Sequence, residues 1–145
     1  MSTATQADAV EVASLLRPVL LRLGRELRRE AQVFGVTPGQ ATLLAQIEKH
    51  DAVGLGELAA DEGVSPAAMS KHVDRLVAAD LVTRTQGGDK RRIEIELTPK
   101  GRRVLRRVRS HRTAWLAERL GRLDEAELAA VKRAIAPLAT MLEQA

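Results

Sequence analysis

The sequence has 145 residues and a formal net charge of +4, with 45% apolar residues, no cysteine and only two aromatic residues, Phe34 and Trp115. Such a chain fits one domain, or one compact domain carrying helical extensions, with a core of Leu, Val, Ile and Ala, which favours helices over a β-sandwich or barrel. The lack of cysteine excludes disulfides, zinc ribbons and thiol chemistry. Because the N-terminal stretch has no secretory signal pattern and no apolar run approaches the ~20 residues of a membrane span, we expect a cytoplasmic protein.

The first part of the chain is predicted to form two helices. The first covers roughly residues 8 to 33, where leucines recur at helical spacing: Leu16, Leu20, Leu23 and Leu27. Pro18 lies inside this pattern and should either kink the helix or mark its true start. The second helix is predicted to be capped by Thr37, with Pro38 in the first helical position and Gln40 completing a capping box. The glycine-containing stretch DAVGLGEL then predicts a break.

The next segment, LGELAADEGVSPAAMSKHVDRLVAADLV, predicts two short helices joined by a tight turn. Gly63 ends the first helix in the left-handed conformation, Val64 points inward, and Ser65 caps the second helix ahead of Pro66. The apolar face of the second helix consists of Met69, Val73, Leu76 and Val77. Its outer face carries Pro66, Ala67, Ser70, Lys71 and Asp74. This arrangement is typical of a helix-turn-helix.

A β-hairpin is predicted directly after this motif. Residues 81 to 85 form one strand, the GGDKRR segment turns, and the partner strand alternates apolar residues at Ile93, Ile95 and Leu97. A hairpin in this position is a wing, whose basic tip would lie over the adjacent minor groove of DNA. Asp89 is explained if its carboxylate fixes the guanidinium of Arg91 in one orientation.

Two further helices are predicted to complete the chain. The first starts at Thr98 and Pro99 and runs to about Gly121, and a capping box of Asp124 and Glu127 starts the second. Apolar residues in the last helix repeat at spacings of three and four, which indicates packing on other helices: Leu128, Val131, Ile135, Leu138 and Leu142. Pro137 interrupts this pattern and should bend the helix.

Basic residues concentrate in one part of the chain. Residues 84 to 112 contain eleven Lys or Arg against three Asp or Glu, a local net charge of +8, so the remainder carries −4. A concentration of this size predicts a polyanionic partner, with an anionic membrane surface as the weaker alternative. For residues 102 to 112 taken alone, a solvated helix face is an equally good interpretation.

These features together predict double-stranded DNA as the partner. The outer face of the helix that starts after Ser65 fits a major groove about 12 Å wide, and the free N–H groups at its N-terminus suit a phosphate. Lys71 can reach a guanine edge or a phosphate, whereas Lys90 and Arg92 are assigned to general phosphate attraction. The predicted DNA-binding residues are Ser65, Pro66, Ala67, Ser70, Lys71, Arg75, Arg84, Asp89, Lys90 and Arg91.

From Leu55 to Gly101 the sequence resembles the multiple antibiotic resistance regulator (MarR) family of bacterial winged-helix transcription factors. The resemblance rests on LAADEGVSPAAMSKHVDRLVAADLVTR and on DKRRIEIELTPKG, which is similar to the family's wing signature of D-x-R, a strand and L-T-x-x-G. The signature positions here are Asp89, Arg91, Leu97, Thr98 and Gly101. In the family, the aspartate of this signature orients its arginine in the minor groove of DNA. The resemblance therefore implies these roles for Asp89 and Arg91.

The resemblance also implies an architecture and a mode of action. It implies a single MarR-like domain over residues 1–145, mainly α with a small β-hairpin wing. Residues 37–103 would form the winged helix-turn-helix lobe, and residues 8–36 and 104–145 the helical dimerisation region. A homodimer would bind a pseudo-palindromic operator, usually as a repressor released by a small ligand.

The outer helices independently suggest a dimer. Their apolar stripes are longer than one small lobe can cover, and a two-fold dimer would bury them while spacing two recognition helices about one DNA turn apart. The alternative is that the stripes pack within one chain. The predicted dimerisation residues are Leu16, Leu20, Leu23, Leu128, Val131, Ile135, Leu138 and Leu142.

Other functions find little support in the sequence. The three histidines lie far apart, GGDK lacks the spacing of a P-loop, and no Ser/His/Asp arrangement is legible, so we expect no enzyme, no metal site and no cofactor. The alternatives left open are a non-specific nucleic-acid-binding module and a protein-interaction winged helix. A small-molecule effector would bind between the dimer helices and the lobe, with Ala45, Glu48 and His111 as candidate neighbours. The sequence does not identify the effector.

Overall fold

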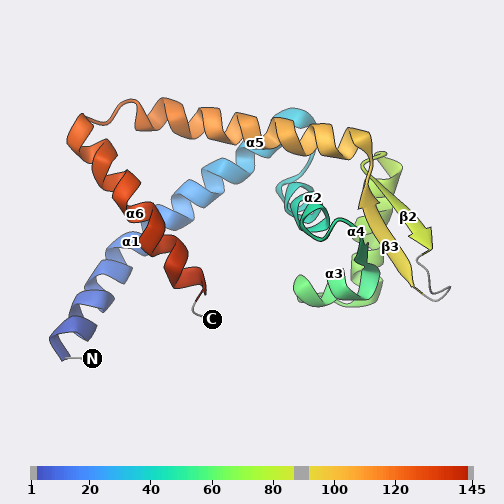
Figure 1. Ribbon diagram of the computed structural model, residues 1–145, viewed down its shortest axis with the longest axis horizontal. Coiled ribbons are helices and arrows are strands. Elements are labelled where there is room, and N and C mark those ends of the chain that lie inside the picture. Colours follow the sequence, from blue (N-terminus) through green and yellow to red (C-terminus); the bar gives the residue numbers. More distant parts are fainter. Residues whose placement is uncertain (1–2, 87–91, 144–145) are drawn as a thin grey trace.

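The computed structural model describes residues 3–86 and 92–143 of the chain. In chain order the elements are α1 (Thr3–Arg29), the 3-10 helix η1 (Glu30–Phe34), α2 (Pro38–His50), β1 (Val53–Gly54), α3 (Leu55–Asp61), α4 (Pro66–Ala78), β2 (Val82–Gln86), β3 (Ile93–Leu97), α5 (Pro99–Leu120) and α6 (Glu125–Glu143). Figure 1 shows the short helices and the strands gathered at one end of α5, while α1 and α6 extend on the other side. None of the helices in the described ranges has the length and apolarity needed to cross a membrane.

The hydrophobic core lies within the group of short elements. It draws on α2, α3, α4, the sheet and the first half of α5, and its buried apolar residues run from Ala31 to Val108. The largest fully buried side chains are Leu44, Ile47, Leu58, Met69, Leu76, Ile95, Leu105, Val53, Val73, Val82 and Val108. All of these residues except Leu105 and Val108 of α5 lie within residues 37–103, the predicted winged lobe.

Helix starts are set by side-chain caps, as the sequence predicts. Thr37, Ser65 and Thr98 each accept a hydrogen bond from the backbone N–H three residues later, at 3.1, 3.1 and 2.9 Å, and proline follows each of them. The carboxylate of Asp124 accepts the same kind of bond at 2.8 Å at the start of α6. A cap satisfies an N–H that the helix itself leaves without a partner. The predicted starts of these four helices are therefore confirmed.

The sheet contains one more strand than the predicted hairpin. Its antiparallel order is β1-β3-β2, with Val53 opposite Ile95 and Val82 opposite Leu97. The break predicted over DAVGLGEL is confirmed at residues 51–54, which separate α2 from α3, but Val53 and Gly54 pair with β3 there and α3 begins at Leu55, inside the predicted break. A strand of two residues carries no alternation that a sequence pattern could reveal.

Two residues predicted to face the core are exposed. Val77 is 40% exposed and Ile93 is 43% exposed. Val77 lies one residue before the end of α4, and Ile93 is the first residue of β3, so each lies beyond the edge of the core. Val77 and Ile93 therefore do not share the burial of the other residues predicted for the same apolar faces, whereas Ile95 and Leu97 are buried as expected.

Both long outer helices run through a proline. α1 begins at Thr3 and continues through Pro18, so the alternative that Pro18 starts the helix is wrong, and α6 likewise continues through Pro137. An internal proline removes one backbone hydrogen bond, which a long helix can lose while its other bonds hold. The predicted first helix also ends early, at Arg29, and residues up to Phe34 form the 3-10 helix.

The end of α1 is attached to the middle of α5. Arg112 Nε donates to the carbonyl oxygen of Leu27 at 2.9 Å, and partial burial lowers the pKa of Arg112 from its ordinary value. His111 contacts the carboxylate of Glu30. Further along α5, the guanidinium of Arg119 lies 3.6 Å from the ring centre of Trp115, and both residues line a shallow hollow with Arg22, Leu23 and Glu26 of α1.

The outer helices leave their apolar stripes uncovered. None of the residues of α1 or α6 whose burial is described is buried in the single chain. Ile135 is 61% exposed and Leu142 is 82% exposed. Among the other predicted dimerisation residues, Leu16 and Leu138 are half-buried, and the exposed ones are Leu20, Leu23, Leu128 and Val131.

Candidate nucleic-acid interface

The predicted helix-turn-helix is formed by α3 and α4. Gly63 adopts a φ of +65° in the turn, and the N–H of Val64 donates to the carbonyl oxygen of Ala59 at 3.0 Å. Val64 packs against the core, as predicted. On α4, Met69, Val73 and Leu76 are each at most 2% exposed, so they hold this helix against the lobe. The opposite face of α4 is turned away from the core, and Pro66, Ala67, Lys71 and Asp74 on it are exposed.

The exposed face of α4 carries most of the residues predicted to contact DNA. Ser65, Pro66 and Ala67 are exposed at its N-terminal end, and Lys71 and Arg75 are exposed further along. Ser70 is half-buried. Side chains at the leading end are small, which lets the helix backbone approach the floor and edges of a groove.

Arg84 differs from the other predicted contacts because its guanidinium is already engaged within the protein. From β2 it pairs through Nη1 with the carboxylate of Asp74 on α4. Its Nη2 donates to the backbone oxygen and to the hydroxyl oxygen of Ser70, at 3.0 and 3.1 Å. The structure thus brings together three residues that the sequence separates by 10 and 14 positions.

The tip of the wing, with the predicted Asp89, Lys90 and Arg91, lies outside the described residues, and their roles stay predictions. Immediately before β3, Arg92 Nη2 lies 2.6 Å from the carboxylate of Glu57 on α3. Arg92 therefore has a partner within the protein, in place of the free charge expected for general phosphate attraction. Sequence reasoning missed this pair because its members are 35 residues apart.

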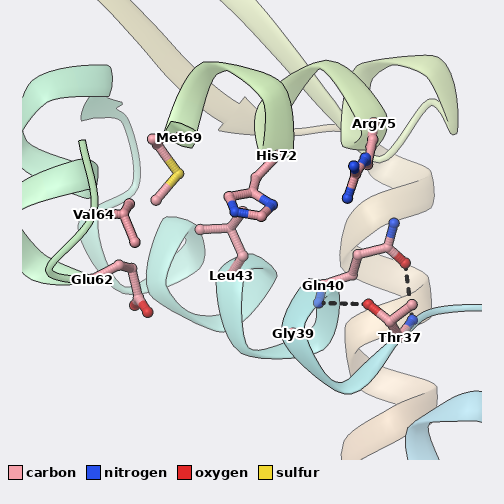
Figure 2. A pocket seen from close by; sticks show the side chains of 9 residues that line it. All are labelled: Thr37, Gly39, Gln40, Leu43, Glu62, Val64, Met69, His72 and Arg75. Carbon is pink, nitrogen blue, oxygen red and sulfur yellow. Dashed lines mark hydrogen bonds between the residues drawn. The ribbon is translucent and has the colours of Figure 1, made fainter. Parts of the chain in front are cut away.

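A pocket of about 360 Å³ opens between α2 and α4 (Figure 2). From α4, the side chains of His72 and Arg75 project toward Leu43 and Gln40 of α2 (Figure 2). The full lining consists of Thr37, Gly39, Gln40, Leu43, Glu62, Val64, Met69, His72 and Arg75. The residues suggested from sequence for an effector do not line it: Ala45 packs against the core, Glu48 pairs with Arg109 at 2.6 Å, and His111 lines an open hollow on α5.

A helix-turn-helix whose second helix is exposed, followed at once by a two-stranded wing, defines the winged helix-turn-helix class of DNA-binding proteins. In this chain, α3 and α4 form the motif and β2 and β3 form the wing, with β1 pairing on the free side of β3.

Comparisons with known proteins narrow this class to one family. The family model described as "MarR family" matches residues 36–93. The HTH-type transcriptional repressor MdtR of Bacillus subtilis is 31% identical over 129 residues, which cover 88% of this chain and 83% of MdtR. The structure of a MarR family protein from Bacillus stearothermophilus matches with a TM-score of 0.79 at 25% identity, over 99% of both chains. A transcriptional regulator from Thermotoga maritima matches with a TM-score of 0.77 at 25% identity, over 92% of this chain and 95% of that one.

The chain belongs to the MarR family. It is a DNA-binding transcriptional regulator with a winged helix-turn-helix fold, and not an enzyme. The predicted family, fold class and general function are confirmed.

Proposed function

We propose that this regulator is a repressor that binds a pseudo-palindromic operator as a homodimer. The observation that carries the proposal is the exposed face of α4, which has small side chains at its N-terminal end and is held rigidly by its buried face. A rigid helix of this shape suits the major groove, where each base pair presents its own pattern of donors and acceptors.

In this proposal the DNA contacts divide between two grooves. Ser65, Pro66, Ala67, Ser70 and Lys71 face the major groove, with Arg75 on the phosphate backbone. The wing tip reaches the minor groove, where Asp89 orients Arg91 and Lys90 attracts phosphate. A narrow minor groove has a strong negative potential, which favours an inserted arginine.

The exposed apolar stripes of α1 and α6 support the homodimer. A second copy related by a two-fold axis would cover the stripes of both chains with one self-complementary surface. We therefore assign residues 8–36 and 104–145 to the dimerisation region and residues 37–103 to the DNA-binding lobe. DNA as the target places the working dimer in the bacterial cytoplasm.

The operator proposal can be tested by selecting duplexes from a randomised pool with the purified protein. We expect enriched sequences with two related half-sites in inverted orientation, about one helical turn apart. Sedimentation equilibrium should show a dimer both free and bound. Salt-dependent binding without sequence preference would contradict the proposal and favour the non-specific nucleic-acid-binding module.

We also propose that a small-molecule effector releases the protein from DNA by binding in the pocket between α2 and α4. The pocket supports this because its wall includes His72 and Arg75 of α4, so an occupant would press on the helix that meets DNA. The complex of the protein with the selected duplex supplies the assay. Each compound is scored for binding to the protein and for release of the protein from the duplex. Compounds that bind this pocket yet leave the complex with DNA intact would contradict the proposal.

A further inference from the structure

Arg84 lies on the face of the wing that is turned toward the protein. Val82, two residues earlier in β2 and so on the same face of the strand, is 1% exposed in the core. Arg84 continues this face beyond the edge of the core, where its side chain meets α4 and remains 31% exposed. Because side chains alternate between the two faces of a strand, the burial of Val82 in the core also turns the side chain of Arg84 toward α4.

The guanidinium of Arg84 holds two successive turns of α4. Ser70 and Asp74 are four residues apart and so lie on one face of the helix. Nη1 pairs with Asp74, while Nη2 donates to both oxygens of Ser70. A planar guanidinium that donates from both terminal nitrogens fixes orientation as well as distance, which a single ammonium group cannot do.

A second arginine links the other strand of the wing to the helix-turn-helix. Arg92, immediately before β3, reaches Glu57 of α3, and its Nε lies 3.3 Å from the point where a Cβ would stand on Gly54. The two strands are thus attached to two different helices, β2 to α4 by Arg84 and β3 to α3 by Arg92. Two attachments on opposite strands limit rotation of the hairpin more than one would.

We propose that Arg84 is a positioning residue, which fixes the wing against α4 through Asp74 and Ser70 so that both elements meet DNA in one relative orientation. This inference rests on the proposed function, in which α4 and the wing enter neighbouring grooves. Arg84 then contributes to DNA affinity by holding the wing and α4 in the right relative orientation. Its positive charge is paired with the carboxylate of Asp74 and does not contact a phosphate.

The two roles of Arg84 predict opposite effects for Asp74→Asn. If Arg84 contacts phosphate, removal of a nearby negative charge should raise DNA affinity. If Arg84 positions the wing, the same substitution should lower affinity for the selected duplex, by about fivefold to tenfold for a partly exposed ion pair with an added hydrogen bond. We expect the loss.

The salt dependence of binding supplies an independent readout. Loss of one phosphate contact reduces the slope of log K against log salt by ~0.9. We expect Arg84→Met to lower affinity to the same extent as Asp74→Asn while leaving this slope unchanged, and Arg84→Met with Asp74→Asn together to cost little more than either alone. Lys71→Met, on the exposed face of α4, is the matched control that removes one charge without touching the cluster.

A charge-reversed pair and a measurement without DNA complete the test. Arg84→Asp combined with Asp74→Arg should recover part of the affinity that each single reversal loses. Without DNA, amide hydrogen exchange in β2 should be faster in Arg84→Met than in wild type and unchanged in Lys71→Met. The inference is wrong if Asp74→Asn binds at least as tightly as wild type, or if Arg84→Met reduces the salt slope.

These results also separate the two proposals. If the wild-type protein selects no duplex, the proposed function fails, and unchanged exchange in β2 of Arg84→Met would overturn the link between wing and α4 on its own.

Discussion

The winged lobe and the outer helices contain similar apolar residues at similar helical spacing, but they differ in what covers them. In the lobe and the adjoining first half of α5, the helices α2, α4 and α5 each bury at least two apolar side chains in a shared core. In α1 and α6 no described side chain reaches that degree of burial. The spacing of apolar residues therefore identifies an apolar helix face in both regions. Only the tertiary structure shows which of these faces is buried within the single chain.

This difference predicts two kinds of stability. The lobe should resist unfolding by an amount that does not depend on protein concentration, because its core is complete in one chain. The outer helices should gain their stability from association, so their unfolding should depend on concentration. The following substitutions test the two regions separately.

The largest effect is expected from a charge placed on the apolar stripe of α6. Ile135→Asp would bury a carboxylate without a partner in the dimer, which costs about 3–5 kcal/mol. Sedimentation equilibrium should therefore show the affinity between the two chains reduced about 1000-fold. Arg133→Asp, on another face of the same helix, is the control and should leave the dimer intact. Equal dimerisation by Ile135→Asp and wild type would show that this stripe is not the interface.

A somewhat smaller effect is expected within the lobe at Gly101. A Cβ at this position would stand 2.1 Å from the carbonyl oxygen of Leu81, a backbone atom that cannot move aside easily. Gly101→Ala should lower the free energy of unfolding by about 3 kcal/mol, the upper part of the range for overpacking. Denaturant unfolding monitored at several protein concentrations measures this change, which should not vary with concentration.

The chain offers a matched control for this substitution. Gly56 lies near the start of α3, and no heavy atom stands within 4 Å of the point where its Cβ would lie, so alanine fits there. Gly56→Ala should change stability by less than about 1 kcal/mol, and in the stabilising direction. Similar losses from both alanines would mean that the close approach of α5 to Leu81 is not the cause.

The smallest effect is expected from the hydroxyl of Thr98, which joins the turn between α4 and β2 to the start of α5. Thr98 Oγ1 donates to the carbonyl oxygen of Asp80 at 2.6 Å and accepts from the N–H of Gly101 at 2.9 Å. Thr98→Val keeps the shape but removes both bonds, which should cost about 1–2 kcal/mol. Thr140→Val on the exposed α6 is the control, and equal losses from the two would contradict a special role for Thr98.

Much of the fold could be predicted from local signals. Thr37, Ser65 and Thr98 each combine a capping side chain with a following proline, and such starts depend on adjacent residues alone. Gly63 is equally local, because its φ of +65° is a conformation that glycine adopts at low cost. The helix-turn-helix is legible in the sequence for the same reason.

The parts that sequence reasoning missed depend on contacts between distant residues. The pairing of Val53 with Ile95 creates β1, and the contacts of Arg84 and Arg92 with α4 and α3 give both arginines a partner. A basic residue in a charged stretch looks the same in sequence whether it meets solvent, phosphate or a carboxylate. Only its neighbours in space distinguish these cases.

The position of Trp115 has a practical consequence. It is the one tryptophan of the sequence, and it lies on α5 beside α1 with Arg119 over its ring. Its ultraviolet emission therefore comes from a single known place, next to helices that we assign to dimerisation and away from the α4 surface that we assign to DNA. The molecule carries an intrinsic optical probe of chain pairing, with no label to attach.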